Sequence, residues 1–302
     1  MTTRLTLVHA MSPLHAGTGQ SVGAIDLPIA RERPTGIPLI PGSSIKGALR
    51  ARSADVPWTR DIFGPDTEHS SEHSGSVQFS DVHLLLLPVR SIRGTFAWVT
   101  SPFLIRRFAR GARQAGLDLA RLPEPPDLKA CCVLSETITL PVPNGRKVVF
   151  EDLDFAVSTD TGKEALLRAF TVQLGALLFP QGSADEQDWR QSLTDRICLI
   201  HDDIMSMLLE TATEVNAHVR LNNETKTVER GALWYQESLP AESVLAGITV
   251  AADVNAANGR SERSGDELLN HVATLTKGLV QLGGKATTGQ GSCFVRLAGG
   301  RS

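Results

Sequence analysis

The chain has 302 residues, of which 41% are hydrophobic and 21% charged, and its net charge is −3. These values are typical of a globular protein with one large or two small domains, and they exclude a fibre or a mostly disordered chain. The N-terminus is too poor in apolar residues for a secretory leader and no stretch is long enough to span a bilayer, so we expect a cytoplasmic protein without a membrane partner.

The charge is unevenly distributed along the chain. Residues 1–113 contain 13 Lys and Arg against 8 Asp and Glu, a balance of +5, and the remainder contains 17 against 25, a balance of −8. One part of the chain could therefore meet a polyanion, although scattered surface charge is an equally good interpretation. The four cysteines form no C-x-x-C pair and are expected to be reduced and buried.

The first expected elements are a strand, predicted by alternating polar and apolar residues, and a short helix. "RLTLVHA" predicts a strand that leads into the loop "MSPLHAGTGQSVG". Pro41 and Gly42 then precede a short helix in which Ser43 or Ser44 is the expected N-cap, because Ile45, Ala48 and Leu49 recur at helical spacing. The exposed face of this helix would carry Lys46, Arg50 and Arg52.

Further along, polar residues 64–76 predict a mobile loop and residues 77–89 a strand. Helices are expected at 100–116, where the sequence is basic, at 162–179, at 202–215 with Asp202 or Asp203 as N-cap, and at 264–282. Alternation on both sides of a polar turn predicts a projecting hairpin at about 216–240. This mixture, without a regular βα repeat, indicates an α+β domain with insertions.

A glycine-rich segment, "GGKATTGQG", surrounds Lys285 near the end of the chain. It is not a nucleotide-hydrolysing P-loop, because Ala286 follows Lys285 and no helix comes next. Its free backbone amides could cradle phosphates, and a plain tight connection from a helix to a strand is equally compatible with the spacing.

Three segments together resemble the RAMP superfamily of CRISPR-associated RNA-binding proteins: "SPLHAGTGQ", "IPGSSIKGALR" and "LGGKATTGQG". Residues 23–50, 79–107 and 224–240 more narrowly resemble the repeated backbone subunit of Cmr (type III-B) effector complexes. The resemblance implies a single RAMP domain over 1–302, with a ferredoxin-like, RRM-related palm, helical insertions and a β-hairpin thumb at about 216–240.

The resemblance also implies a function. Copies of such a subunit stack along a CRISPR guide RNA with other Cmr subunits, and each copy, active only in the assembled complex, cuts the paired target RNA with the help of a divalent ion, Mg or Mn. Asp26 stands at the position of the family's catalytic aspartate and could act as metal ligand or general base. His15 is either a catalytic helper or a hydrogen-bonded structural residue.

RNA contacts are expected at several other positions. Arg31 and Arg33 are candidates for phosphate binding, with surface ion pairing to Glu32 as the alternative. Glu224 and Thr225 lie nearest the expected thumb tip. The remaining expected RNA-binding residues are Ser43, Ser44, Lys46, Arg50, Gly283, Gly284, Lys285, Thr287 and Gly289. Two other functions stay open: a subunit that binds RNA without cutting it, and an unrelated phosphate-binding enzyme.

Overall fold

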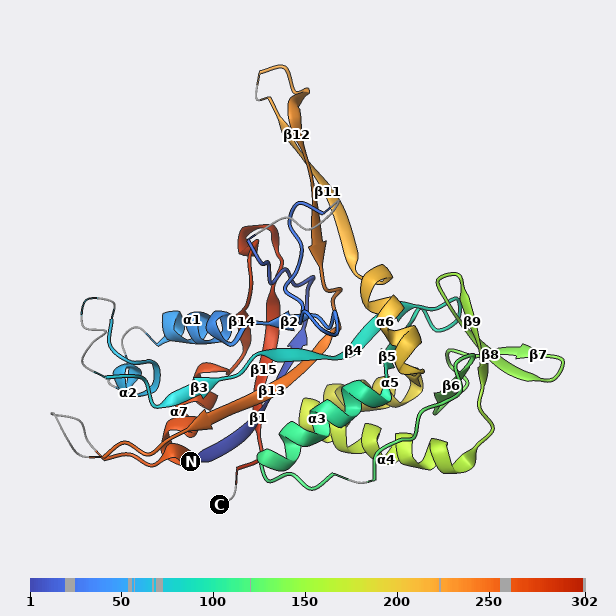
Figure 1. The fold of residues 1–302 in the computed structure, drawn as a ribbon, viewed down its shortest axis with the longest axis horizontal. Coiled ribbons are helices and arrows are strands. Elements are labelled where there is room, and N and C mark those ends of the chain that lie inside the picture. Colours follow the sequence, from blue (N-terminus) through green and yellow to red (C-terminus); the bar gives the residue numbers. More distant parts are fainter. Residues whose placement is uncertain are drawn as a thin grey trace.

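The computed structural model describes residues 1–19, 25–53, 56, 58–66, 68, 73–119, 121–222, 224–255 and 262–300. Within them a curled sheet of 13 strands runs through the molecule in the order β14-β15-β1-β13-β4-β5-β10-β6-β9-β8-β7, with β2 on β4 and β3 on β13 (Figure 1). The strands are β1 (Thr2–Ala10), β2 (Leu39–Ile40), β3 (Val77–Phe79), β4 (Val82–Arg90), β5 (Phe96–Thr100), β6 (Ala130–Val133), β7 (Leu140–Val142), β8 (Gly145–Phe150), β9 (Leu153–Val157), β10 (Ile197–Leu199), β13 (Val244–Ala251), β14 (Leu279–Gln281) and β15 (Ser292–Ala298).

Helices cover both faces of this sheet. Successive residues of a strand point to opposite faces, and in β1 Arg4 donates hydrogen bonds to Asp266 and Asn270 while Leu5 lies against Gly111. The helices are α1 (Gly42–Arg52), α2 (Thr59–Phe63), α3 (Pro102–Gln114), α4 (Thr161–Leu178), α5 (Ala184–Arg196), α6 (Asp202–Thr211) and α7 (Gly265–Leu275). Arg4 therefore points toward α7, and α3 covers the opposite face.

The predicted strand at the N-terminus and the basic helix at 100–116 are confirmed as β1 and α3. Leu84–Leu87 in β4 are buried without a polar break, because both faces of this part of the sheet are covered. All four cysteines are free and buried, as expected, and burial raises the pKa of Cys132 to about 12. Among the described residues no helix is both long and apolar enough to cross a membrane.

Several element boundaries differ from the sequence prediction. The helix expected at 264–282 ends at Leu275, and Gly278, with φ of +72°, turns the chain into β14. The strand expected at 77–89 is divided into β3 and β4 at Ser80, whose hydroxyl accepts the Ile248 N–H. The loop prediction at 64–76 falls partly outside the described residues, at 67 and 69–72.

Both predicted N-caps are wrong. Pro41 occupies the cap position of α1, so Ser43 and Ser44 lie inside the first turn, and the Gly42 N–H donates to the Asp81 carboxylate instead. In α6 the cap is His201, whose Nδ1 accepts the Asp203 N–H at 3.2 Å. In each helix the actual cap lies one or more positions before the predicted one.

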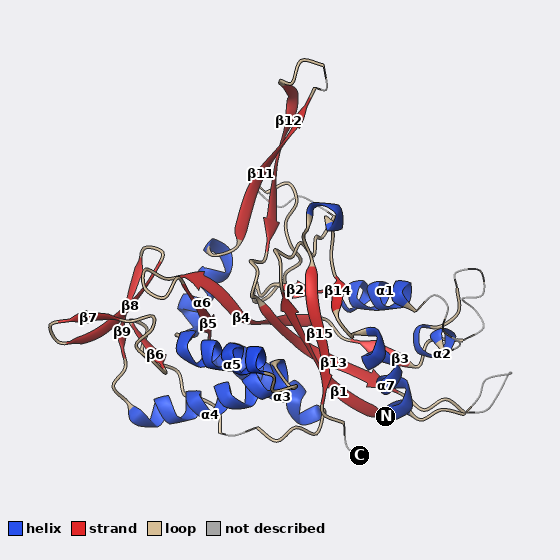
Figure 2. Ribbon diagram, turned by 180° about the vertical axis from the view of Figure 1, so that it is seen from behind, coloured by secondary structure: helices blue, strands red, loops and turns tan. Residues whose placement is uncertain are grey.

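The predicted hairpin at about 216–240 is confirmed. Strands β11 (Glu214–Leu221) and β12 (Val228–Ser238) pair only with each other among the described strands and extend away from the rest of the molecule (Figures 1 and 2). We call this pair of strands the projecting hairpin. Its base lies beside the segments that contain His15 and Asp26.

Candidate active site

Asp26 lies in a short segment that pairs with the base of the projecting hairpin. The Leu27 N–H donates to the Tyr235 carbonyl at 3.0 Å, and the Leu27 carbonyl accepts the Glu237 N–H at 2.9 Å. One Asp26 carboxylate oxygen accepts the Tyr235 N–H at 2.8 Å. Ile25 and Leu27 are half-buried and Asp26 is exposed, so the alternation holds the carboxylate in solvent. Its second oxygen has no partner among the described residues and is free to bind a cation or a proton.

His15 is buried, with 7% of its surface exposed, at the foot of the same hairpin. Its Nδ1 lies 2.7 Å from the Glu237 carbonyl oxygen. Because a carbonyl only accepts, Nδ1 carries the hydrogen of this bond. A Cβ on Gly17 would lie 2.7 Å from Nε2, so the glycine makes room for the ring. This geometry favours the structural interpretation of His15.

The glycine-rich loop packs on the His15 segment, so two of the resembling motifs meet in space. The Gly284 N–H donates to the His15 carbonyl at 2.9 Å, and the Gly291 N–H donates to the Pro13 carbonyl at 2.9 Å. A Cβ at Gly283 would lie 2.4 Å from that His15 oxygen, which only a glycine allows. Lys285, Thr287 and Gly289 remain exposed.

One expectation for this loop is wrong. It joins strand β14 to strand β15, whereas a helix-to-strand connection was expected. The backbone amides of Gly283 and Lys285 have no hydrogen-bond partner within the described part of the chain. The loop therefore keeps the exposed amides and the exposed Lys285 that an anion site requires.

Glu237 is a residue of the candidate site that the sequence interpretation missed. Its side chain is 4% exposed and accepts hydrogen bonds from Arg31 at 2.5 Å, from the Thr213 hydroxyl at 3.0 Å and from the Ile29 N–H at 3.0 Å. Glu237, which lies in β12, therefore connects the Asp26 segment to this strand and to Thr213, the residue directly before β11. The available signal was an acidic residue at a buried position of a strand with alternating polar and apolar residues. Glu237 entered the sequence interpretation only as part of the segment 224–240 that resembles the Cmr subunit.

The Glu237 contacts also correct the interpretation of Arg31. Arg31 pairs with Glu237, and its other terminal nitrogen donates to the Gly36 carbonyl at 2.9 Å. Within the described residues it does not pair with Glu32, which is bound to Arg107 instead. Arg33 is exposed and has no ion-pair partner among the described residues.

The predicted RNA-binding residues on α1 differ in exposure and in hydrogen bonding. Ser43 is exposed, Ser44 and Lys46 are half-buried, and the Lys46 amine has no partner in the described ranges. Arg50 donates to the Pro65 carbonyl at 2.7 Å, so its guanidinium is partly occupied.

At the hairpin tip the Glu224 and Thr225 N–H groups donate to the Asn222 side chain at 2.9 and 3.0 Å. This local turn leaves the Glu224 and Thr225 side chains exposed.

The described residues contain no group of three or more His, Cys, Asp or Glu side chains that could hold a metal ion. Asp26 is a single exposed carboxylate, and Mg²⁺ is commonly bound by one or two carboxylates together with water and substrate phosphates. Asp26 thus suits one ligand position of an ion that is shared with a phosphate-bearing substrate.

Known proteins resemble this chain over nearly its whole length. A model of the RAMP superfamily matches residues 7–294. The chain is 32% identical over 298 residues to the CRISPR system Cmr endoribonuclease Cmr4 of Pyrococcus furiosus, covering 96% of this chain and 94% of the relative. It is 24% identical to the CRISPR system CMR subunit Cmr4 of Saccharolobus solfataricus, with the same coverage of 96% and 94%.

Solved structures share the fold over the whole chain. A crystal structure of oligomeric Cmr4 from Pyrococcus furiosus has a TM-score of 0.72 at 27% identity and covers 100% of this chain and 99% of that one. A chain in the cryo-EM structure of the type III-B Cmr-beta bound to cognate target RNA has a TM-score of 0.70 at 18% identity, with coverage of 98% and 97%.

Proposed function

The chain belongs to the RAMP superfamily, and from that membership we propose that it is the repeated backbone subunit of a type III-B CRISPR effector complex. It binds a guide RNA along a filament of its own copies, together with other Cmr subunits, and cleaves the paired target RNA at regular intervals. The observation that carries this proposal is the full-length similarity to a relative that is a Cmr endoribonuclease.

The strand order supports a ferredoxin-like palm. Strands β15-β1-β13-β4 are consecutive and antiparallel, α1 lies between β1 and β4 in the chain, and α7 lies between β13 and β15. This is the β-α-β-β-α-β arrangement of such folds. The elements between β4 and β13 are then insertions, and the projecting hairpin among them serves as the thumb.

Asp26 supplies the chemistry of cleavage. RNA carries its own nucleophile, the 2′-hydroxyl, so the site must align that group with the phosphate and manage one proton or one positive charge. The Tyr235 N–H fixes one carboxylate oxygen and leaves the other for a Mg or Mn ion or for the hydroxyl proton. A bound divalent ion would neutralise charge that develops on the phosphate.

Guide binding is proposed for the surface that α1 and the glycine-rich loop form together. Lys46 and Lys285 offer unpaired amines, and the Gly283 and Lys285 amides are free within the described ranges. Arg52 ties the end of α1 to the Lys277 and Leu279 carbonyls, which precede the loop. The two predicted phosphate-binding elements are therefore held as neighbours.

Substitution of Asp26 tests the cleavage role. We expect Asp26→Asn to remove most cutting of a labelled complementary RNA by the assembled complex, with guide and target affinity nearly unchanged, because removing one negative charge near RNA weakens no attraction. Asp118→Asn is the matched control, since Asp118 is exposed on the segment after α3 and should leave an even ladder of cuts. Products should end in a 2′,3′-cyclic phosphate, and EDTA should stop the reaction.

Four outcomes would change the role of Asp26 or the proposed function. An undiminished ladder from the Asp26→Asn complex would return Asp26 to a structural role. A rate restored by high pH without metal would favour the general-base role over the metal-ligand role. If the wild-type complex binds guide and target but never cuts, the chain is a non-catalytic subunit. Activity on a small phosphate compound without RNA would indicate an unrelated enzyme.

A further inference from the structure

A cleft of about 280 Å³ lies between α3 and the face of the sheet opposite α1 and α7. Its floor is apolar and its rim is polar. The cleft is lined by the apolar residues Leu5, Leu84, Leu85, Leu104, Phe108 and Ile248 and by the polar residues Ser80, Asp81, His83, Arg107, Arg110 and Gln114. Leu5, Leu85, Leu104 and Phe108 are buried and form the floor, whereas the polar residues are half-buried or exposed. An apolar interior with a few polar groups at its edge is typical of a site for a small planar ligand.

Glycine at position 111 helps to keep the cleft open. A Cβ on Gly111 of α3 would lie 3.4 Å from Ile248 Cγ2 and 3.8 Å from Leu5 Cδ1, so it would point at the floor. A larger side chain at this position would fill the space without changing any charge. The helix geometry tolerates such a residue, because Gly111 has no positive φ.

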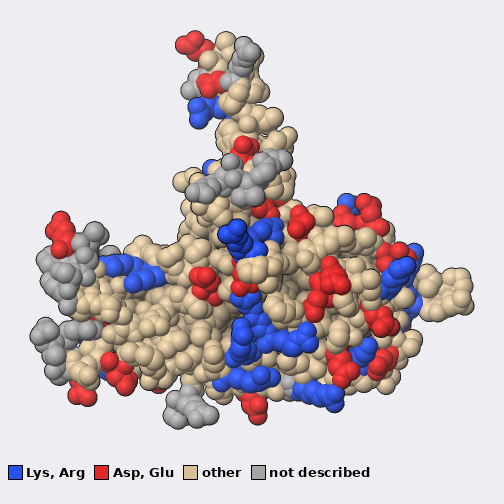
Figure 3. Space-filling model, in the orientation of Figure 1, with Lys and Arg blue, Asp and Glu red and all other residues tan. Residues whose placement is uncertain are grey.

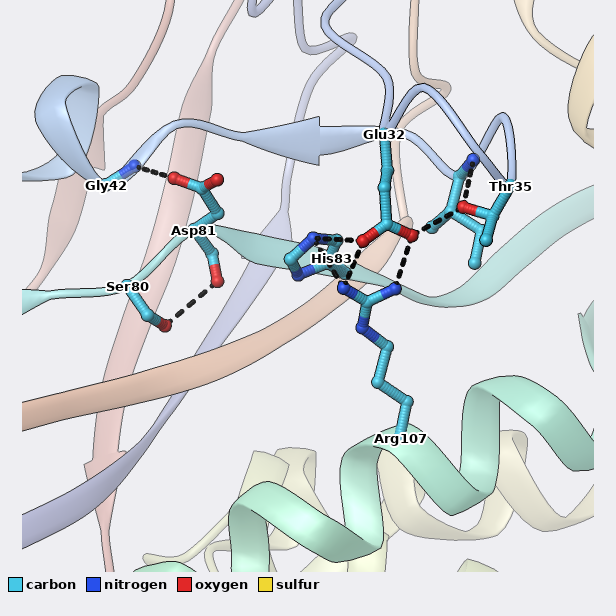
Figure 4. A network of polar contacts seen from close by, with 8 residues as sticks. Glu32, Thr35, Gly42, Ser80, Asp81, His83 and Arg107 are labelled. Carbon is cyan, nitrogen blue, oxygen red and sulfur yellow. Dashed lines mark hydrogen bonds and ion pairs between the residues drawn. The ribbon is translucent and has the colours of Figure 1, made fainter.

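One end of the cleft is built by a polar network (Figure 4). The Arg107 guanidinium donates to both Glu32 oxygens at 2.7 Å and lies 2.9 Å from His83 Nε2. Because Arg107 is always a donor, Nε2 must accept, and the neutral ring then carries its hydrogen on Nδ1. Burial and the neighbouring Arg107 lower the pKa of His83, which keeps the ring neutral. His83 thus offers an N–H donor that has no partner among the described residues.

The outer face of α3 carries a row of arginines beside the cleft. Arg106, Arg110 and Arg113 are spaced i, i+4 and i+7 and therefore lie along one helix face. Arg106 reaches Asp202 at 3.5 Å, whereas Arg110 and Arg113 are exposed and unpaired within the described chain. Figure 3 shows blue side chains gathered over this part of the molecule, below the projecting hairpin.

We propose that this cleft binds one unpaired RNA nucleotide, with the base in the cavity and adjacent phosphates on Arg110 and Arg113. The proposal rests on the proposed function and adds a second RNA contact outside the surface of α1 and the glycine-rich loop. A base is flat and apolar on its faces and has hydrogen-bonding edges, which the floor and the His83 N–H and Gln114 amide match. The unpaired cations favour an RNA strand over a protein side chain as occupant.

Binding of a 12-nucleotide single-stranded RNA to the full chain, measured by fluorescence polarisation at several salt concentrations, tests the proposal. Gly111→Leu should weaken binding by roughly fivefold or more because it blocks the base, with the salt slope unchanged. Arg110→Gln should weaken binding and lower the magnitude of the slope by about one. Arg121→Gln is the control, because Arg121 is exposed and paired with nearby Glu124, and should bind as wild type.

An RNA of the same length without bases makes the test specific to this cleft. The affinity lost when the bases are removed should be smaller for Gly111→Leu than for wild type, and an equal loss in both would overturn the proposal. Wild-type chain crosslinked to RNA containing 4-thiouridine should label peptides within 80–85, 104–114 or 246–248. Crosslinks confined to other peptides would also overturn it. No RNA binding by wild type at any salt concentration would instead withdraw the proposed function itself.

Discussion

Glu32 and Arg107 are 75 positions apart in the chain and form a two-bond ion pair in the folded protein. The hydrogen bond from Arg107, together with one from the Thr35 hydroxyl at 2.6 Å, lowers the pKa of Glu32 to about 2 from its ordinary value of 4.5. The pair joins the loop after Asp26 to α3. Protonation of Glu32 would therefore weaken the connection between this loop and α3.

The lowered pKa predicts a dependence of stability on pH. A carboxyl group whose folded pKa is depressed contributes stability above its unfolded value and loses it as the pH falls through the folded value. Wild type should therefore be more stable than Glu32→Gln by about 1 kcal/mol above pH 5. The difference should shrink from pH 4.5 toward pH 2. Urea unfolding between pH 2.5 and 7 measures it, and a constant difference over that range would contradict the assignment.

Lys46 on α1 has an unpaired amine, and its loss should affect RNA binding more than folding. Each phosphate contact adds about one to the magnitude of the salt slope, so Lys46→Ala should lower that slope by about one for every guide sequence. Lys129→Ala, at an exposed site before β6, is the matched control. Guide binding by Lys46→Ala that equals wild type at every salt concentration would show that the proposed binding surface is misplaced.

At the scale of elements, the glycine-rich loop depends on close backbone contact with the His15 segment. Gly283 has φ of +74° and no room for a Cβ, whereas Gly278 has φ of +72° and no atom within 4 Å of the position that a Cβ would take. Both glycines have a positive φ, but only Gly283 lies so close to the His15 carbonyl that a Cβ has no room. They therefore form a matched pair for testing how the loop is held.

Alanine substitutions at these two glycines should separate strain from contact. Gly278→Ala should cost about 1 kcal/mol, because a residue with a side chain rarely adopts a positive φ. Gly283→Ala should cost about 1–3 kcal/mol more, since the loop must also move away from the His15 carbonyl. Urea unfolding of both variants measures the difference. Equal losses in the free energy of unfolding would mean that the loop accommodates a Cβ at position 283 at no extra cost.

At the scale of the whole molecule, the projecting hairpin has two unlike faces. One face is apolar and exposed along most of its length, where it carries Val215, Ala217, Val219, Leu221, Val228, Leu233 and Tyr235. The buried Glu237 lies on the same face at the base, opposite Val215. The other face is more polar and carries His218 stacked on Trp234 at 5.7 Å between ring centroids. A contiguous run of exposed apolar side chains is typical of an interaction surface, and a two-stranded hairpin is only marginally stable by itself.

We expect the apolar face to contact the next copy in RNA-dependent oligomers, because head-to-tail contacts that do not close generate filaments. Leu233→Asp should shift RNA-bound complexes toward single copies in light scattering, while the far-UV circular dichroism of the free chain stays unchanged. Asn216→Asp adds the same charge on the other face and should leave assembly intact. Wild type that stays strictly monomeric on a long guide RNA would contradict the filament.

The sequence by itself determined those elements whose signal is local. Alternation predicted β1 and the hairpin, and 3.6-residue spacing predicted α3 and most of α1, because the burial pattern of one element repeats along its own residues. Helix α5 was not predicted, since it is largely polar and buries only Glu186 and Leu193. Strands β6 to β9 were missed because each has only three to six residues.

Only the tertiary structure decided which side chains meet. The carboxylate of Asp26 is fixed by a backbone amide 209 positions away, and Arg31 finds its partner 206 positions away. A repeating pattern records which face of an element is buried and carries no information about the distant residue against which that face packs. The sequence thus marked Asp26 and the glycine-rich loop as candidates and predicted the hairpin, and the packing of the folded chain brings Asp26 and the His15 segment, on which the loop packs, to the base of the hairpin.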